Sequence, residues 1–257
     1  MRTTTKLGTA TLGSALLLTL GAGMAQAATA ADGNTMATLR PVALNGVDAS
    51  GTAMVTVNGT RIDVTMAASG LLADSPHAAH IHFGADARHE CPTAKDDAKG
   101  DGTLNTTDGA PAYGPIVVSL TKTGDTSPDS GLAVDRFDTA PGGKISYERG
   151  SIEVSSDVAK AISDGQSVVV VHGVDHNDNG KYDGDTKSDL DPSLPTEATD
   201  PAICGVLNAA PAGGMDTGAG GTSTPNHNEA MLLLGGGLLV AAAGTGAFTA
   251  RKARNRA

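Results

Sequence analysis

Apolar and polar residues alternate on both sides of Asn58 and Gly59, and this pattern constrains the fold more than any other feature of the chain. The alternation runs over 52–58 before the pair and resumes over 61–66 after it. An Asn-Gly pair between two such runs is a strong signal for a β-hairpin. Further short strands are predicted at 79–83, 116–120, 145–147 and 167–172, and one short helix at 156–164. Many short strands joined by long polar loops predict an all-β domain.

The N-terminal residues have the layout of a secretory signal peptide. Arg2 and Lys6 precede an apolar run over 12–23, and Ala25-Gln26-Ala27 follows as a small-x-small cleavage site. The alternative is a permanent membrane helix. However, the run has about 12 residues and a membrane span needs roughly 20. We therefore expect residues 1–27 to be removed on export.

The C-terminal residues predict a membrane anchor. Residues 231–250 carry no charge, and residues 251–257 form a basic tail. Twenty helical residues measure about 30 Å, enough to cross the hydrocarbon core. Basic residues remain on the cytoplasmic side, which places the preceding domain outside the cell. The layout also resembles a Gram-positive cell-wall sorting signal, but no Leu-Pro-x-Thr-Gly motif precedes the span. Attachment by sortase is therefore the minor alternative.

The chain between these ends is predicted to be an ectodomain over 28–208 and a Gly/Pro/Thr-rich stalk over 209–230. Once both ends are set aside, 12 basic and 28 acidic residues remain, a net charge near −16. Nucleic-acid binding is excluded because phosphates need a basic face. The charge favours solubility and cation binding, with a solvated acidic surface as the alternative. We expect a monomeric ectodomain on the outer face of the cell membrane or cell wall, and the sequence points to no particular protein partner.

The two cysteines, Cys91 and Cys204, both lie in the exported part. Outside the cytosol, a lone pair of cysteines most simply forms a disulfide. We therefore predict that Cys91 and Cys204 are joined.

Three histidines form a candidate metal site. His80 and His82 are two residues apart on a predicted strand, so their imidazoles face the same side. His172 ends the apolar strand 168–171, which we expect to be buried on both faces. Clustered imidazoles suit copper or zinc. The alternative is that these histidines point outward into solvent.

Three segments resemble the Cu,Zn superoxide dismutase family. Residues 70–84, followed by Cys91, are similar to that family's Gly-Leu turn, His-x-His strand and first cysteine. The Val-Val-Val-His-Gly segment at 169–173 is similar to its late copper-ligand strand, and Ala-Ile-Cys-Gly-Val at 202–206 to its closing segment, whose cysteine pairs with the first. The His-x-His segment also resembles the chordin-type (CHRD) domain. The resemblance implies a Greek-key β-sandwich with His80, His82 and His172 as copper-type ligands.

The chain departs from that family where the chemistry is most demanding. No histidine lies between Cys91 and Ile116, where the family has its bridging and zinc ligands, so zinc is not expected. Pro201 occupies the place of the arginine that orients superoxide, and Asp200 beside it would repel an anion. The resemblance therefore implies weak dismutase activity at most.

Two acidic loops resemble calcium-binding loops of the EF-hand type, each with glycine at position 6, where the turn is sharp. The ligands predicted in the first are Asp97, Asp101, Asn105 and Asp108, and those in the second, weaker loop are Asp175, Asn177, Asn179 and Asp183. Lys99 stands at a ligand position of the first loop, and the second has no acid at position 12. The alternative is that both are ordinary Asp/Asn/Gly turns.

Three functional hypotheses follow. The leading one is a surface-anchored, metal-binding β-sandwich domain, with copper and calcium as the expected ions. The second is an enzyme, a diverged copper-only superoxide dismutase. The third is a metal-free structural or adhesion module that keeps the fold without the chemistry.

Overall fold

The predicted hairpin forms two long neighbouring strands of an antiparallel sheet. The computed structural model describes residues 33–210. In it β2 (Ser50–Asn58) and β3 (Arg61–Ser69) are joined by a two-residue turn of Gly59 and Thr60. Gly59 has φ 65, a value that glycine adopts without the steric cost other residues bear. Glycine at the first central position is what a type II′ turn requires. The hairpin prediction is confirmed.

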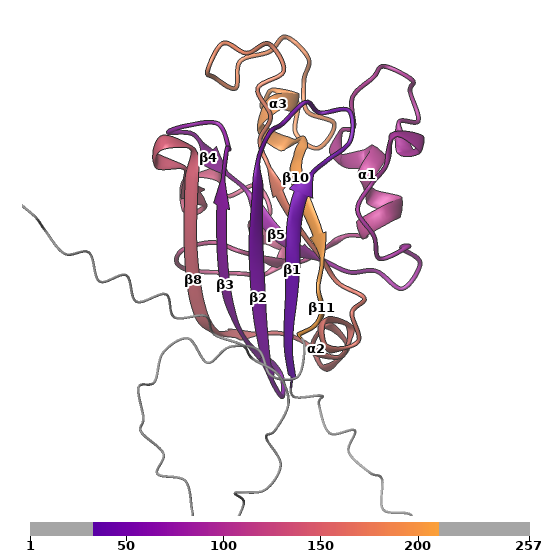
Figure 1. Ribbon diagram of the computed structural model, residues 1–257, viewed down its shortest axis with the longest axis vertical. Coiled ribbons are helices and arrows are strands. Elements are labelled where there is room, and N and C mark those ends of the chain that lie inside the picture. Colours follow the sequence, from indigo (N-terminus) through magenta and orange to yellow (C-terminus); the bar gives the residue numbers. More distant parts are fainter. Residues whose placement is uncertain (1–32, 211–257) are drawn as a thin grey trace, which may run out of the picture. The chain divides into compact units, whose positions relative to one another are not determined.

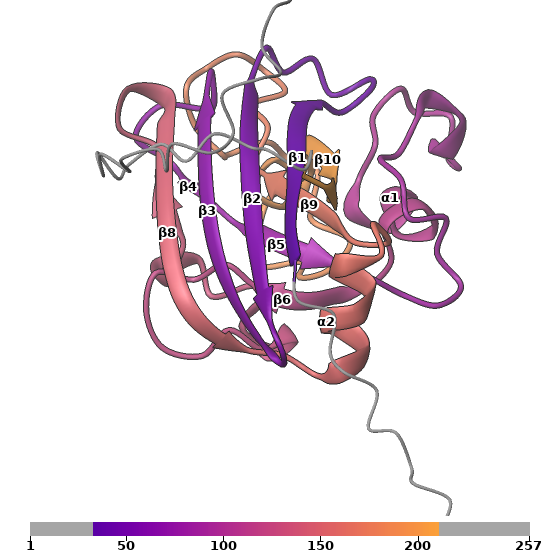
Figure 2. The same cartoon turned by 60° about the horizontal axis from the view of Figure 1, so that its bottom comes forward.

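The hairpin belongs to a sheet that curls into two facing layers (Figures 1 and 2). The front layer contains β1 (Gly33–Pro41), β2, β3 and β8 (Lys144–Glu153), with the short β11 (Asn208–Ala209) also paired to β1. The back layer contains β10 (Pro201–Val206), β9 (Val168–His172), β5 (Ala79–His82) and β6 (Ile116–Ser119). The layers are continuous because β1 pairs with β2 over 33–39 and with β10 at Arg40 and Pro41. The domain is therefore mostly β, as the sequence predicts.

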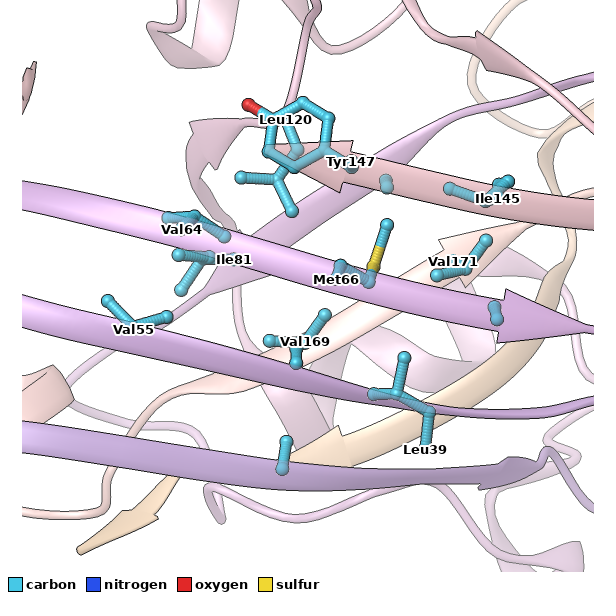
Figure 3. Close-up of a cluster of buried hydrophobic side chains, with 14 of the residues drawn as sticks. Leu39, Val55, Val64, Met66, Ile81, Leu120, Ile145, Tyr147, Val169 and Val171 are labelled. Carbon is cyan, nitrogen blue, oxygen red and sulfur yellow. The ribbon is translucent and has the colours of Figure 1, made fainter. Parts of the chain in front are cut away.

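The main core lies between the two layers (Figure 3). Buried and exposed residues alternate along the front strands, so that each presents one apolar face inward. Val55 and Val64 come from the front layer, and Ile81, Val169 and Val171 from the back layer. Such burial of aliphatic side chains is the main stabilising contribution in a domain with few aromatic residues.

The two central strands of the back layer, β5 and β9, are buried on both faces. Every residue of β5 and β9 is buried, as the unbroken apolar run at 168–171 predicts. The outer face of β9 contributes Val168 and Val170 to a second apolar cluster with Leu104, Tyr113 and Cys204. Because residues alternate along β5 and β9, the histidines of these strands share that outer face.

Within residues 33–210 the helices are few and short. The predicted helix at 156–164 is observed as α2 (Ser156–Ser163), and the Ser155 side chain accepts a hydrogen bond from the Val158 N–H at its start. The other helices are α1 (Thr106–Tyr113) and α3 (Thr196–Thr199), with single 3₁₀ turns η1 (Ala94–Asp96), η2 (Pro128–Ser130), η3 (Val134–Arg136) and η4 (Pro141–Gly143). A small separate sheet pairs β4 (Pro76–His77) with β7 (Asp138–Thr139).

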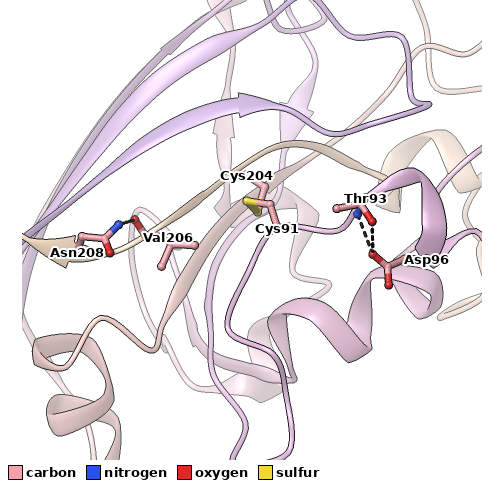
Figure 4. The surroundings of a disulfide bond; sticks show 6 residues. All are labelled: Cys91, Thr93, Asp96, Cys204, Val206 and Asn208. Atoms are coloured by element: carbon pink, nitrogen blue, oxygen red, sulfur yellow. Dashed lines mark hydrogen bonds between the residues drawn. A yellow bond between two sulfur atoms is a disulfide. The ribbon is translucent and has the colours of Figure 1, made fainter.

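The predicted disulfide is present. Cys91 and Cys204 are joined, with their Cα atoms 5.8 Å apart. Figure 4 shows the bond between β10 and the loop that leads into η1. The disulfide therefore fixes the loop before α1 to the back layer.

The predicted signal peptide (1–27), membrane anchor (231–250) and basic tail (251–257) lie outside the described residues, as does the stalk beyond residue 210. Ala209, the first residue predicted for the stalk, pairs with Thr35 as part of β11. Within residues 33–210, no helix has both the length and the apolar character needed to span a membrane.

Candidate metal centre

Three histidines from two adjacent back-layer strands converge on the outer face of that layer. In the antiparallel pairing of β5 with β9, His80 lies opposite Val170, so His172 is its diagonal neighbour on the same face. His82 lies two residues beyond His80 and faces the same way. The three side chains are 2–4 % exposed. Each offers a ring nitrogen, and these atoms lie within 4.8 Å of one another.

One nitrogen of each imidazole contacts a backbone carbonyl. The contacts are His80 Nε2 to Gly131 O (3.0 Å), His82 Nδ1 to Gly114 O (2.8 Å) and His172 Nδ1 to Thr199 O (2.7 Å). A carbonyl oxygen only accepts hydrogen bonds, so the nitrogen facing it carries the proton. These contacts fix the tautomer and the orientation of all three rings.

The other nitrogen of each ring has no hydrogen-bond partner. These atoms are Nδ1 of His80, Nε2 of His82 and Nε2 of His172. A buried acceptor without a partner lowers the unfolding free energy by about 1–3 kcal/mol. Three such atoms close together are therefore rare in native structures and indicate a binding role. A metal ion bound by all three would satisfy them. In metal-binding histidines the N–H of the second ring nitrogen characteristically donates a hydrogen bond to a carbonyl or carboxylate, and these three rings all contact carbonyls in this way.

Burial keeps the three imidazoles neutral. It lowers the pKa of His82 to about 3 and that of His172 to about 4. Burial also lowers the pKa of His80 well below its usual range, with His172 and His82 as further causes. All three rings are therefore unprotonated at neutral pH, which is the form that ligates a metal. A set of three neutral imidazoles fits copper or zinc.

Two aromatic rings hold the histidines in place. Phe137 meets His80 edge to face at 5.3 Å between ring centroids, and Tyr113 lies 4.5 Å from His82. The Tyr113 hydroxyl donates a hydrogen bond to the Thr106 carbonyl at 2.9 Å. Neither aromatic residue belongs to a motif that marks it in the sequence. The whole chain has only three Phe and three Tyr, and this rarity is the one sequence feature that could have singled these residues out.

A cavity of about 370 Å³ borders the three histidines. Its other walls are mainly apolar. They come from η2, from η3, from the loop before α3 and from α3 itself. Leu132 and Leu190, which are 40 % and 47 % exposed, belong to its lining, so it reaches the surface. The buried histidines therefore border a cavity that opens to the surface.

The other early histidines have different roles. His77 is buried, with Nδ1 2.8 Å from the His172 carbonyl and Nε2 3.0 Å from the Leu72 carbonyl. His89 stacks on Phe83, and its Nε2 lies 2.8 Å from a backbone carbonyl. Both rings thus pack against the backbone beside the metal site and do not contribute ligands to it.

The residues of the first predicted calcium loop form two pairs. The Asp97 carboxylate accepts backbone N–H groups from residues 100, 101 and 102, while that of Asp101 accepts from Thr103. Asn105 and Asp108 bond reciprocally, side chain to backbone, at the start of α1. The second pair therefore caps a helix that the sequence analysis did not predict.

The second predicted calcium loop is held by its own polar groups. The Asp175 carboxylate accepts from the backbone N–H of Asn179 and Gly180. Asp183 Oδ1 accepts from the side-chain amides of Asn177 and Asn179, at 3.3 and 2.8 Å. The four predicted ligands are thus brought together in one turn.

The two acidic loops border a common pocket, which Asp101 and Asn105 line from the first loop and Asn177 from the second. Glu197 also lines it and is buried, and its carboxylate accepts backbone N–H groups from His176, Asp183 and Gly184. Within residues 33–210, the three histidines form the one group of three His, Cys, Asp or Glu residues whose ligand atoms lie within 4.8 Å of one another. Calcium binding in the acidic loops stays a prediction.

No known family model matches this sequence. No curated protein matches it either.

Proposed function

We propose that this chain is an extracytoplasmic, surface-anchored domain that binds a copper ion through His80, His82 and His172. The observation that carries the proposal is the set of three buried imidazole nitrogens, without partners and within 4.8 Å of one another. Neutral imidazole is a good ligand for Cu²⁺, which stands above the other divalent ions of its row in affinity. Copper is therefore favoured over zinc on ligand chemistry.

We also propose that the curled sheet is a Greek-key β-sandwich of the Cu,Zn superoxide dismutase or CHRD type. Support comes from the order of the three resembling segments along the chain. They contain the two ligand strands β5 and β9 and the disulfide-bearing strand β10, which are neighbours in the back layer. The function is argued from the site itself, because a fold alone does not determine chemistry.

Metal analysis of the purified full-length chain tests the leading function. We expect about one tightly held copper per chain after incubation with Cu²⁺ and removal of the excess. Calcium alone would favour a calcium-binding surface module. The absence of any bound metal would favour the structural or adhesion module and would contradict our proposal.

The dismutase hypothesis is the alternative, and we expect the copper-loaded chain to consume superoxide far below the diffusion limit. Superoxide is an anion, and its fast capture depends on a positive local field. Among the described residues that line the cavity, none is Lys or Arg, and Asp129 adds a negative charge. Superoxide consumption by the copper-loaded chain is the measurement. Near-diffusion-limited turnover that disappears in His80→Ala would make this chain an enzyme.

Calcium is expected to bind weakly at 97–108, with a Kd of about 10⁻⁴–10⁻³ M, as extracellular loops of this type show. At about 10 mM calcium, such affinities raise the unfolding free energy by roughly 1.4–2.7 kcal/mol. Asp101→Ala should remove this gain, whereas Asp86→Ala, an exposed acid outside both loops, should retain it. Thermal melting with calcium and with chelator is the measurement. Identical melting of the unaltered chain in both conditions would show that the loop is only a turn.

The predicted anchor gives a test of localisation. We expect the full chain in the membrane fraction and a chain ending at residue 230 in the soluble fraction, because residues 231–250 are long enough to span a bilayer. Cell fractionation with detection of the C-terminus decides this. Full-length protein free in the medium, with residues 231–257 intact, would contradict the anchor.

A further inference from the structure

The cavity beside the histidines has an apolar wall that metal binding alone does not require. The wall contains six large apolar side chains, namely Ile116, Leu132, Val134, Phe137, Leu190 and Leu194. These residues come from β6, from the segment 131–137 and from the segment 190–194, which are far apart in sequence. Leu132 and Leu190 are among the few exposed large apolar residues of the described domain. Exposed leucines around a hollow are typical of a surface that accommodates a ligand.

The size and charge of the cavity define the kind of ligand. Its volume of about 370 Å³ lies in the range that small-molecule sites occupy. Among the described residues of its lining, Asp129 is the one charged side chain, and none is Lys or Arg. Apart from the metal itself, an anion would therefore find no cationic partner, while an apolar body would bury its surface against the leucines. Three histidines also leave at least one coordination position of a bound metal open.

We propose that the cavity binds a small uncharged molecule with an apolar body and one lone-pair-bearing head. The head would be a further ligand of the metal, and the body would lie along the apolar wall. This inference rests on the proposed copper site, because the three histidines that carry the unpartnered nitrogens line the same cavity. It assigns the site to apolar ligands and not to the small anions that a dismutase admits.

The test uses the copper-loaded full-length chain and a series of 4-n-alkylpyridines, from 4-methylpyridine to 4-hexylpyridine, at about pH 8. Their metal-binding nitrogen carries one lone pair and is uncharged at this pH, and only the alkyl body grows. Affinity is read from the change in the copper visible absorption band. Each buried methylene contributes about 0.8 kcal/mol, so we expect affinity to rise about fourfold per added methylene. The copper-free chain, titrated by calorimetry, should bind the series far more weakly.

Matched variants locate the effect. Leu190→Asn removes an apolar side chain of the wall and should flatten the dependence on chain length. Met54→Gln changes a residue of equal exposure, 47 %, on the outer face of β2 in the other layer, and should leave the dependence unchanged. Equal affinity for the shortest and longest alkylpyridines, with copper retained, would overturn this inference and leave the metal site standing. Failure to bind copper at all would overturn the proposed function, and this inference with it.

Discussion

We expect copper to raise the melting temperature of this protein by roughly 5–10 °C at a hundredfold excess over its Kd, and His172→Ala to abolish the effect. A ligand that binds only the folded state at this excess adds about 2.7 kcal/mol to the unfolding free energy. For a domain of this size, each kcal/mol shifts the melting temperature by about 2–4 °C. His172→Ala removes one of three ligands, and the two remaining imidazoles lie on a single strand. Thermal unfolding with and without Cu²⁺ provides the measurement.

His89→Ala is the matched control for this experiment. This variant also removes an imidazole, but the His89 ring stacks on Phe83 and is not one of the three predicted metal ligands. We expect its copper-induced shift to equal that of the unaltered chain. A full shift in His172→Ala would show that copper binds elsewhere, for example at the acidic loops. Equal loss in His89→Ala and His172→Ala would show that the variants act through general destabilisation.

We expect removal of the disulfide to lower the unfolding free energy by up to about 4–5 kcal/mol. Cys91 and Cys204 are 113 residues apart in sequence, and the entropy of closing so long a loop in the unfolded chain sets this upper estimate. The double variant Cys91→Ala, Cys204→Ala is the appropriate one, because alanine places no new polar group in the apolar cluster around Cys204. Urea denaturation of the variant and the oxidised chain provides the measurement.

The same variant should also bind copper less tightly. The loop that Cys91 anchors donates backbone hydrogen bonds from Arg88 and Glu90 to carbonyls near the end of α1. Gly114 directly follows this helix, and its carbonyl orients His82. Freeing the loop therefore loosens one of the three contacts that fix the imidazoles. Unchanged stability, or two free thiols in the native chain by mass spectrometry, would contradict the disulfide's role.

The elements that the sequence predicted well are those determined by local patterns. The hairpin needs only alternation and a turn glycine, and the shared face of His80 and His82 needs only their spacing. His172 could be proposed because its strand is uniformly apolar. The disulfide could be proposed because two cysteines in a chain expected to be exported have few alternatives.

The unpredicted parts depend on contacts between distant residues. The carbonyls of Gly131 and Thr199 orient His80 and His172 across 51 and 27 residues, and no backbone carbonyl has a signature in sequence. Helix α1 was missed because its capping residues, Asn105 and Asp108, also match the calcium-loop pattern. The apolar cavity was missed because segments without any motif of their own assemble it.

The apolar lining of this cavity bears on how the metal would reach its ligands. An aqueous Cu²⁺ ion holds its hydration shell strongly, and its passage along an apolar lining that includes Leu132 and Leu190 would remove part of that shell before the imidazoles replace it. We therefore expect copper to load more slowly here than at solvent-exposed imidazoles. The same barrier would act on release and trap the bound ion kinetically. The rate at which a chelator removes copper would then be limited by the departure of the ion from the cavity and be independent of the chelator's concentration.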